Sequence, residues 1–278
     1  MTKVVITAAG KGTRLLPFTK EMPKEMMPIF SNVFTNNRVV LPLLQYIYEQ
    51  LYSMNFRDYC FVVGRDKQSI KNHFTPDVNF QNFLSQKNNS IMNKFYKKLE
   101  NSNLGWVNQS KPYGFGDAVR QSEKFVGKDN FLVHGGDVAI LSNGKKNHSL
   151  KTLIKLGNNS TASAILLFRK VSDPKRHGVP TLEKISKERY LVKNVIEKPS
   201  KPKSNFGLLP IYLFTPRIFE KLKQIVPGKG NEYQLTDAIQ KLVDDNERVI
   251  AIPIKPYETV IDVGTISSYK AALKTTFH

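Results

Sequence analysis

The sequence lacks the features that mark several classes of protein. It has one cysteine, Cys60, so no disulfide can form within the chain. Its longest apolar runs, such as Ala162 to Phe168, fall well short of the roughly 20 residues that a membrane-spanning helix needs. The amino-terminal MTKVVITAAG opens on a strand pattern rather than on a signal peptide. We therefore expect a globular cytoplasmic protein without a membrane partner, in which Cys60 packs in the core.

Acidic residues are also scarce, since 23 Asp and Glu face 42 Lys and Arg and the net charge is +19. Such a surplus favours polyanionic partners, whether nucleic acid, an acidic membrane or phosphorylated metabolites. The basic residues are spread along the chain without a run of five or six, so no concentrated nucleic-acid tract is visible. The five histidines show no metal-ligand spacing of the His-x-x-x-His type. The total charge alone does not choose among these partners.

Strand and helix patterns alternate along the chain. A β-branched run at Lys3 to Ala8 predicts a buried strand, and Leu44, Ile47, Tyr48 and Leu51 are spaced as one face of a helix within 41–54. Similar patterns predict strands at 59–63, 131–134, 162–168, 190–196 and 208–214, and helices at 66–74, 150–156, 216–224 and about 235–243. Residues 77–103 read as a polar helical excursion. This alternation is typical of βαβ units and predicts an α/β fold.

The first strand runs into a loop rich in glycine, proline and basic residues, AAGKGTRLLPFTKEMPKEMMPI at 8–29. Gly10 and Gly12 free the backbone N–H groups to form an anion-binding nest, and Arg14 and Lys24 add positive charge. A dinucleotide fingerprint fits poorly because Leu15 stands where its third glycine belongs. A Walker A loop is excluded because no Gly-Lys-Ser/Thr ends the run. The loop is suited to a triphosphate.

This loop resembles the signature of the sugar-1-phosphate nucleotidyltransferases, and its Pro23-Lys24-Glu25-Met26-Met27-Pro28 extension resembles their bacterial-type uridylyltransferases. Four later blocks agree in order with that family: QSKPYGFGDA, GDV, EKP and EYQLTDAI with IDVG, between residues 109 and 264. The resemblance implies a doubly wound, largely parallel but mixed Rossmann-like sheet. It also implies one domain over 1–278, with nucleotide binding at about 1–140 and sugar binding and dimerisation at about 141–278.

The resemblance assigns roles to individual residues of this chain. Gln109 offers a donor and an acceptor to the edge of uracil, and Lys198 neutralises the phosphate of the sugar while Glu197 accepts hydrogen bonds from its hydroxyls. The expected catalytic residues are Arg14, Lys24 and Lys198. The expected nucleotide-binding residues are Ala8, Ala9, Gly10, Gly12, Thr13, Gln109 and Gly114. The expected sugar-phosphate residues are Gly178, Glu197 and Lys198.

Two aspartates predict a metal site. Asp137 and Asp262 each follow an apolar strand, in FLVHGGD and ETVID, where a parallel sheet places its ligands. Two carboxylates held close together repel each other unless a cation lies between them. With phosphate oxygens and waters, the pair suits Mg²⁺, which is the expected cofactor.

The implied reaction is the transfer of the uridylyl group of UTP to glucose 1-phosphate, giving UDP-glucose and pyrophosphate. A thymidylyltransferase that uses dTTP remains open, since uracil and thymine differ by one methyl group. A nucleotide-sensing or nucleic-acid-binding protein without turnover is a rival of another class. The intact Arg14, Lys24, Asp137, Lys198 and Asp262 argue against that rival. We expect a homo-oligomer, a dimer or a tetramer, that does not bind nucleic acid.

The chain departs from the family pattern in two places. Asp117 stands where the family usually has His, which adds a negative charge beside the expected nucleotide. Residues 31–42, SNVFTNNRVVLP, are longer than the family's usual turn and lack its Lys. We expect a dimer or substrate contact to differ there.

Overall fold

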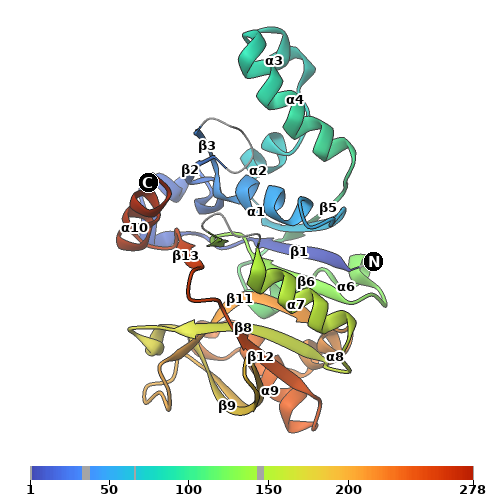
Figure 1. Ribbon diagram of the computed structural model, residues 1–278, viewed down its shortest axis with the longest axis vertical. Coiled ribbons are helices and arrows are strands. Elements are labelled where there is room, and N and C mark those ends of the chain that lie inside the picture. Colours follow the sequence, from blue (N-terminus) through green and yellow to red (C-terminus); the bar gives the residue numbers. More distant parts are fainter. Residues whose placement is uncertain (1, 33–37, 66, 143–146, 278) are drawn as a thin grey trace.

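The computed structural model describes residues 2–32, 38–65, 67–142 and 147–277. Its centre is a nine-stranded sheet that draws strands from both halves of the chain (Figure 1). These strands are β1 (Lys3–Ala8), β4 (Asp58–Gly64), β5 (Asn103–Gln109), β6 (Phe131–Gly135), β8 (Ala164–Lys170), β9 (Gly178–Ser186), β10 (Arg189–Glu197), β11 (Phe206–Phe214) and β12 (Val249–Pro253). Their order across the sheet is β5-β4-β1-β6-β11-β8-β12-β10-β9.

The sheet is mixed but largely parallel, as predicted. Neighbours among β5, β4, β1 and β6 pair in parallel, and so do β8 and β12. β11 runs antiparallel between β6 and β8, and β10 runs antiparallel to both β12 and β9. The predicted strands at 3–8, 59–63, 131–134, 190–196 and 208–214 are all present, with small shifts at their ends.

Helices cover both faces of the sheet, which confirms the doubly wound arrangement. Side chains alternate along β1, so that Val4, Ile6 and Ala8 join one core cluster while Val5 joins the other. The first cluster includes residues of α1 (Leu43–Tyr52), α2 (Gln68–His73), α4 (Gln86–Glu100), α7 (His148–Asn158) and α10 (Ile266–Phe277). The second includes residues of α5 (Phe115–Arg120), α6 (Glu123–Val126), α8 (Arg217–Gln224) and α9 (Leu235–Asp244).

The local helix predictions hold. Leu44, Ile47, Tyr48 and Leu51 of α1 are completely buried, as the spacing predicted. The polar stretch at 77–103 forms α3 (Val78–Asn82) and α4, a helical pair that projects at the top of Figure 1. Cys60 is buried in β4, in agreement with a structural role. Asp66, expected to cap the helix after β4, lies outside the described residues.

Two small antiparallel ribbons, which the sequence patterns did not predict, complete the fold. One pairs β2 (Pro28–Ser31) with β3 (Val39–Pro42), at the two ends of the long 31–42 segment, of which 33–37 lie outside the described residues. The other pairs β7 (Val138–Leu141) with β13 (Thr259–Asp262). The helix α10 contacts both β2 and β13. The two ribbons thus provide the strands against which the last helix packs.

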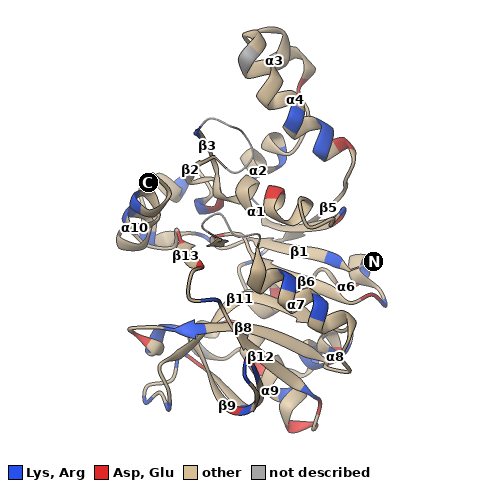
Figure 2. Cartoon of the chain, viewed as in Figure 1, with Lys and Arg blue, Asp and Glu red and all other residues tan. Residues whose placement is uncertain are grey.

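Lys and Arg occur on elements throughout the molecule (Figure 2), as the sequence indicated. Among the described residues, no helix has the length and hydropathy needed to cross a membrane.

Candidate active site

The topology creates a switch point at the carboxyl ends of the parallel strands. The chain leaves β1 for β4 and β5 on one side and returns to β6 on the other, so the loops after β1 and β6 diverge. Such a switch point is where open α/β sheets bind their ligands. Register pairs align Ala8 with Val63, Thr7 with Gly135, and Gly64 with Gln109. The predicted loop, Gln109 and the segment before Asp137 therefore share one edge of the sheet.

The glycine-rich loop after β1 is held by its own contacts. Gly12 has a φ of 65°, in the left-handed region that favours glycine, and a Cβ there would lie 3.1 Å from Thr19 Cβ. The Thr19 hydroxyl donates a 2.7 Å hydrogen bond to the Gly12 carbonyl, and Leu15 anchors the loop in the interior. The exposed Gly10 leaves its backbone accessible. The loop is therefore preformed for a ligand rather than dependent on one.

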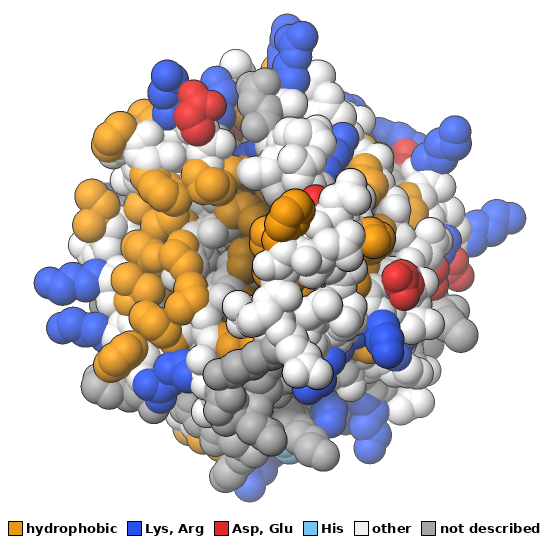
Figure 3. Space-filling model, turned by 90° about the horizontal axis from the view of Figure 1, so that it is seen from above, with side chains coloured by type: hydrophobic (Ala, Val, Ile, Leu, Met, Phe, Trp, Pro, Cys, Tyr) orange, Lys and Arg blue, Asp and Glu red, His pale blue; other side chains and the backbone are white. Residues whose placement is uncertain are grey.

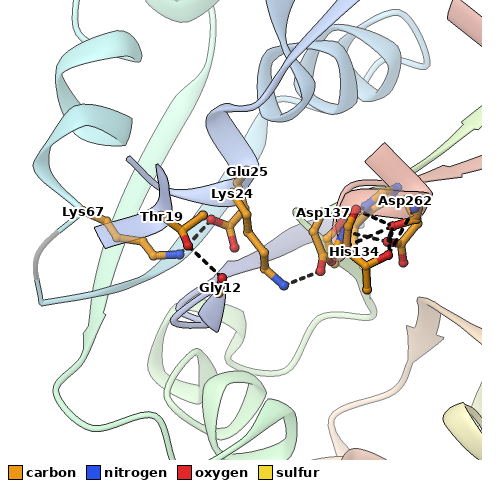
Figure 4. A network of polar contacts seen from close by, with 12 residues as sticks. Gly12, Thr19, Lys24, Glu25, Lys67, His134, Asp137 and Asp262 are labelled. Atoms are coloured by element: carbon orange, nitrogen blue, oxygen red, sulfur yellow. Dashed lines mark hydrogen bonds and ion pairs between the residues drawn. The ribbon is translucent and has the colours of Figure 1, made fainter. Parts of the chain in front are cut away.

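Four charged side chains form what we call the lysine–carboxylate cluster: Lys24, Glu25, Lys67 and Asp137 (Figure 4). Lys24 Nζ donates to Asp137 Oδ2, and Lys67 Nζ donates to Glu25 Oε2 at 2.7 Å. Only 2% of the surface of the Glu25 side chain is exposed to solvent, whereas 23% of the surface of the Asp137 side chain is exposed. The cluster thus joins the loop, the end of β4 and the end of β6 through two ion pairs.

Burial and charge compete in this cluster. Burial opposes the charged form of Lys24, but attraction to Asp137 and Glu25 outweighs it, and the pKa of Lys24 is raised. Burial likewise disfavours the Asp137 carboxylate, yet Lys24 holds its pKa below the usual value. For Lys67 burial prevails over the attraction of Glu25, and its pKa is lowered. The Lys24–Asp137 pair is consequently ionised at neutral pH.

Asp262 lies beside Asp137, as predicted. The backbone N–H of Val263 donates to the Asp137 carbonyl at 3.1 Å, and Asp262 pairs in register with Val138. Its Oδ1 accepts from Gly264 N at 2.6 Å and from Ser268 Oγ at 2.9 Å. One expectation was wrong: Asp262 does not end a strand of the parallel sheet. It ends β13 of the small antiparallel ribbon, because β7 follows directly after Asp137 and pairs with β13.

The two aspartates have the donor chemistry of a hard-cation site. Lys24 donates to Oδ2 of Asp137, and Gly264 and Ser268 donate to Oδ1 of Asp262, so each carboxylate has a second oxygen that takes part in none of these bonds. Within the described ranges, no group of three or more His, Cys, Asp and Glu side chains could hold a metal. A site here would rest on two protein carboxylates and complete its shell with substrate oxygens and waters, which suits Mg²⁺. The residues present fit that ion.

The predicted sugar-phosphate residues also come together, in what we call the Gly178 cluster: Gly178, Glu197, Lys198 and Thr236. Gly178 and Glu197 pair in register on β9 and β10. Lys198 Nζ lies 3.0 Å from Glu197 Oε1, and the Thr236 hydroxyl donates to Glu197 Oε2 at 3.0 Å. Lys198 has a φ of 43° and is tied by its N–H to the carbonyl of His177 at 2.9 Å. A Cβ at Gly178 would lie 2.7 Å from Thr236 Cγ2, so the close packing requires glycine.

His177 interacts with Glu197 of the Gly178 cluster and with Asp262, and Arg169 interacts with both His177 and Asp262. Burial lowers the pKa of His177, and Arg169, Asp262 and Glu197 all act on the same ring. Arg169 pairs in register with Gly207, whose position leaves room for His177, because a Cβ there would lie 2.9 Å from His177 Cγ. Arg169, near the carboxyl end of β8, and His177 thus connect the Gly178 cluster to Asp262.

Arg14 reaches the same region from the loop after β1. An ideal Cβ on Gly264 would lie 3.3 Å from Arg14 Nη2 and 3.0 Å from Asp262 Oδ1. The guanidinium thus lies next to the aspartate that the sequence predicted as a metal ligand. The exposed Thr13 precedes it in the loop.

Gln109 lies at the end of β5 with only 5% of its surface exposed. Its Nε2 donates to Asp117 Oδ2 at 2.7 Å and to the Gly114 carbonyl at 3.2 Å. Gly114 has a φ of 105°, and a Cβ there would lie 2.7 Å from Glu232 Cβ. This packing against the segment before α9 already requires glycine at 114. A role of Gly114 in nucleotide binding stays a prediction.

The structure adds three residues that the sequence patterns did not single out: Lys67, Arg169 and Thr236. Lys67 and Arg169 follow or end strands β4 and β8, so the argument that found Asp137 could have found them too. Arg169 Nε is buried and has no hydrogen-bond partner among the described residues. Thr236 lies in the EYQLTDAI block, but only its contact with Glu197 indicates its role.

Comparison with known proteins agrees with this geometry. Residues 3–277 match the nucleotidyl transferase family. The chain is 34% identical to a UTP–glucose-1-phosphate uridylyltransferase of Bacillus subtilis, over 96% of this chain and 89% of the relative. It is 35% identical to UTP–glucose-1-phosphate uridylyltransferase 1 of Streptococcus pyogenes, over 92% of this chain and 83% of the relative.

Solved structures give the same result. A UDP-glucose pyrophosphorylase without ligand superposes with a TM-score of 0.88 at 28% identity, covering 100% of this chain and 98% of the other. A UDP-glucose pyrophosphorylase in complex with UDP-glucose gives 0.86 at 29% identity, with the same coverage. The predicted fold and family are thereby confirmed. This chain belongs to the nucleotidyl transferase family.

Proposed function

We propose that this protein transfers the uridylyl group of UTP to glucose 1-phosphate. One observation carries the proposal: the glycine-rich loop and the lysine–carboxylate cluster lie at the switch point, and His177, whose carbonyl accepts from the Lys198 N–H, interacts with both Glu197 and Asp262 and so brings the Gly178 cluster near them. Two polyanionic substrates can meet there among fixed cations. The names of the relatives at 34% and 35% identity support UTP and glucose 1-phosphate as those substrates.

The reaction is a phosphoryl-type transfer. An oxygen of the sugar phosphate attacks the α-phosphorus of UTP and forms a new P–O bond, while the bond to the bridging oxygen breaks and pyrophosphate leaves. The second pKa of a phosphate monoester is about 6, so the nucleophile is already an anion at neutral pH and needs no general base. The protein's task is therefore to position the substrates and to stabilise negative charge.

Each cluster has its own part in that task. The loop at Gly10 and Gly12 holds the triphosphate by backbone N–H groups, and Arg14 and Lys24 offset its charge. Lys198 contacts the phosphate of the sugar, while Glu197, held by Thr236, accepts hydrogen bonds from sugar hydroxyls. Bringing both anions into one orientation is itself a large part of the rate enhancement.

Asp137 and Asp262 are the residues that would hold Mg²⁺. When bound, the ion would neutralise charge on the phosphate oxygens. The cation requirement is tested by turnover in chelated protein with Mg²⁺ added back.

A pyrophosphate-release assay over a matrix of nucleoside triphosphates and sugar 1-phosphates tests the reaction. We expect UTP with glucose 1-phosphate to be the best pair, or dTTP to equal UTP, because a pocket distinguishes a single methyl group by only about 1–3 kcal/mol. Faster use of dTTP than UTP would identify a thymidylyltransferase instead. Faster use of ATP or GTP would refute the pyrimidine assignment of Gln109.

The proposal also includes a homo-oligomer and a cytoplasmic location. Exposed apolar side chains occur at Val40 on β3 and at Ile266 and Phe277 on α10, and hydrophobic side chains gather on one side of the face seen in Figure 3. Such a surface supports self-association. Light scattering of the purified protein tests the oligomer, and a monomer at micromolar concentration would refute it.

A further inference from the structure

The amide of Gln109 is held in one orientation. Its Nε2 donates at 2.7 Å to Asp117 Oδ2, and an ionised carboxylate can only accept hydrogen bonds. The second bond from Nε2, at 3.2 Å, goes to the carbonyl of Gly114, which also only accepts. A flipped amide would set its oxygen against two acceptors. The chemistry of the partners thus fixes Nε2 inward and leaves Oε1 as the atom that can face a ligand.

Asp117 is in turn held firmly. Its side chain keeps 1% of its exposure, and its Oδ1 accepts from Arg120 Nη2 at 2.7 Å and from Gln121 Nε2 at 3.3 Å. The Arg120 guanidinium lies 5.5 Å from the centre of the Tyr233 ring. The neighbouring Gly116 N–H donates to the carbonyl of Tyr233 at 2.8 Å. The carboxylate is therefore paired, buried and fixed to the segment that precedes α9.

We propose that Asp117 is a positioning residue that selects the base, by presenting Gln109 Oε1 as an acceptor. Uracil and thymine carry a hydrogen at N3 and can donate to it, whereas N3 of cytosine has only a lone pair. A cytosine in the same place would set two acceptors against each other, and an unpaired buried acceptor carries a full desolvation cost. This inference rests on the proposed function, in which Gln109 contacts the base.

The test compares kcat/KM for UTP with that for CTP, both with glucose 1-phosphate. In Asp117→Asn the new carboxamide can donate to Gln109 as well as accept from it, so only the longer 3.2 Å bond to the Gly114 carbonyl still favours the wild-type orientation of the amide. We expect the UTP preference over CTP to fall about tenfold, the value of one hydrogen bond. The control is Asp244→Asn, since Asp244 Oδ1 also accepts from a glutamine, Gln240, at 2.7 Å, but on the exposed face of α9. The control should keep the wild-type ratio.

An Asp117→Asn protein that unfolds with the wild-type midpoint and keeps the wild-type UTP:CTP ratio would overturn the inference. A second measurement needs no variant: calorimetric titration of the wild-type protein with UTP, CTP and UTP methylated at N3. We expect CTP and the methylated nucleotide, which both lack the N3 hydrogen, to bind at least tenfold more weakly than UTP. Equal affinities would overturn the inference. Tight UTP binding without turnover of glucose 1-phosphate would instead refute the proposed reaction and leave the role of Asp117 standing.

Discussion

The two clusters of the candidate site solve the problem of charge in different ways. In the lysine–carboxylate cluster, two lysines meet two carboxylates, and the side chains keep between 2% and 23% of their exposure. In the Gly178 cluster, Lys198 keeps 39% of its side-chain exposure, and Glu197 shares its two oxygens between Lys198 and Thr236. The first cluster is enclosed and self-neutralised, whereas the second exposes its lysine to solvent, although 15% of the Glu197 side chain is exposed and Thr236 is buried.

This difference indicates how each cluster contributes to function. Charges out of water need partners, because an unpaired buried charge costs several kcal/mol. The lysine–carboxylate cluster must therefore keep its pairs in the free protein, and a change there disturbs both catalysis and stability. If Lys198 binds the sugar phosphate as proposed, the phosphate replaces water at an exposed lysine, at little cost to the fold. Changes there should act mainly on the sugar substrate.

The largest effect is expected for Asp137→Asn, which removes the carboxylate that pairs with Lys24 and is proposed to hold Mg²⁺. The activation barrier should rise by about 4 kcal/mol, so that turnover falls roughly a thousandfold, because a metal's charge matters most as the phosphoryl oxygens gain charge. UTP binding, measured by calorimetry, should be largely retained. Asp129→Asn is the control, since Asp129 pairs with Lys3 at 2.9 Å on the surface. Turnover near the wild-type value at limiting Mg²⁺ would exclude Asp137 as a metal ligand.

A second prediction concerns how stability depends on pH, through a buried histidine near the lysine–carboxylate cluster. His134, three residues before Asp137, is completely buried, and burial lowers its pKa to about 4 from 6.5. Between these values the unfolded chain binds more protons than the folded one, so stability falls as the pH drops from 6.5 toward 4. The full contribution is about 3 kcal/mol, at 1.36 kcal/mol per pKa unit.

Denaturant unfolding at pH 7 and pH 4.5 measures this contribution. His134→Gln should lose less stability between the two pH values than the wild-type protein does. His73, whose pKa burial also lowers to about 4, is present in both proteins and cancels in the difference. Equal losses in the two proteins would show that His134 is not held neutral by the fold.

A change in the Gly178 cluster should have a smaller effect, and one on substrate use rather than on stability. Lys198→Ala removes the proposed charge-assisted contact with the sugar phosphate, worth about 1.5–3 kcal/mol, so kcat/KM for glucose 1-phosphate should fall roughly 10- to 100-fold. UTP affinity and unfolding should stay near the wild-type values. Lys193→Ala is the matched control, because Lys193 lies on β10, the strand that Lys198 follows, and pairs with Glu183 of β9 at 2.9 Å. Lost UTP affinity with normal use of glucose 1-phosphate would move Lys198 to the triphosphate side.

How far the sequence could predict the site depends on whether a feature is local or requires distant residues to pair. Local patterns located β1, α1 and the glycine-rich loop, because apolar spacing and glycine punctuation are local signals. The sequence correctly predicts that Asp262 lies beside Asp137, but it wrongly predicts that the strand before Asp262 belongs to the main parallel sheet. The β7–β13 pairing joins residues more than a hundred positions apart, and four-residue strands carry too little pattern to reveal it.

Other features depend on contacts that no local pattern encodes. Lys67 and Arg169 are only two of many residues that end or follow predicted strands, and their interactions with Glu25 and His177 are what single them out. From the sequence alone, Asp117 in place of the family's usual His predicts an added negative charge beside the nucleotide. The structure shows a buried carboxylate matched by Arg120 and used to hold Gln109. Partners of this kind become visible only when the chain is folded.

The smallest effect is expected where the Gly178 cluster depends on space rather than charge. In Gly178→Ala the new Cβ would lie 2.7 Å from Thr236 Cγ2, so Thr236 must shift away from Glu197. Overpacking of this kind costs about 1–3 kcal/mol, and the displaced Glu197 should raise KM for glucose 1-phosphate. Adding Thr236→Ser removes the clashing methyl group but keeps the hydroxyl that donates to Glu197. The double variant should therefore recover both KM and the unfolding midpoint, whereas Thr236→Ser alone should change neither by much. If the serine failed to rescue Gly178→Ala, the clash with Thr236 would not be the reason for glycine at 178.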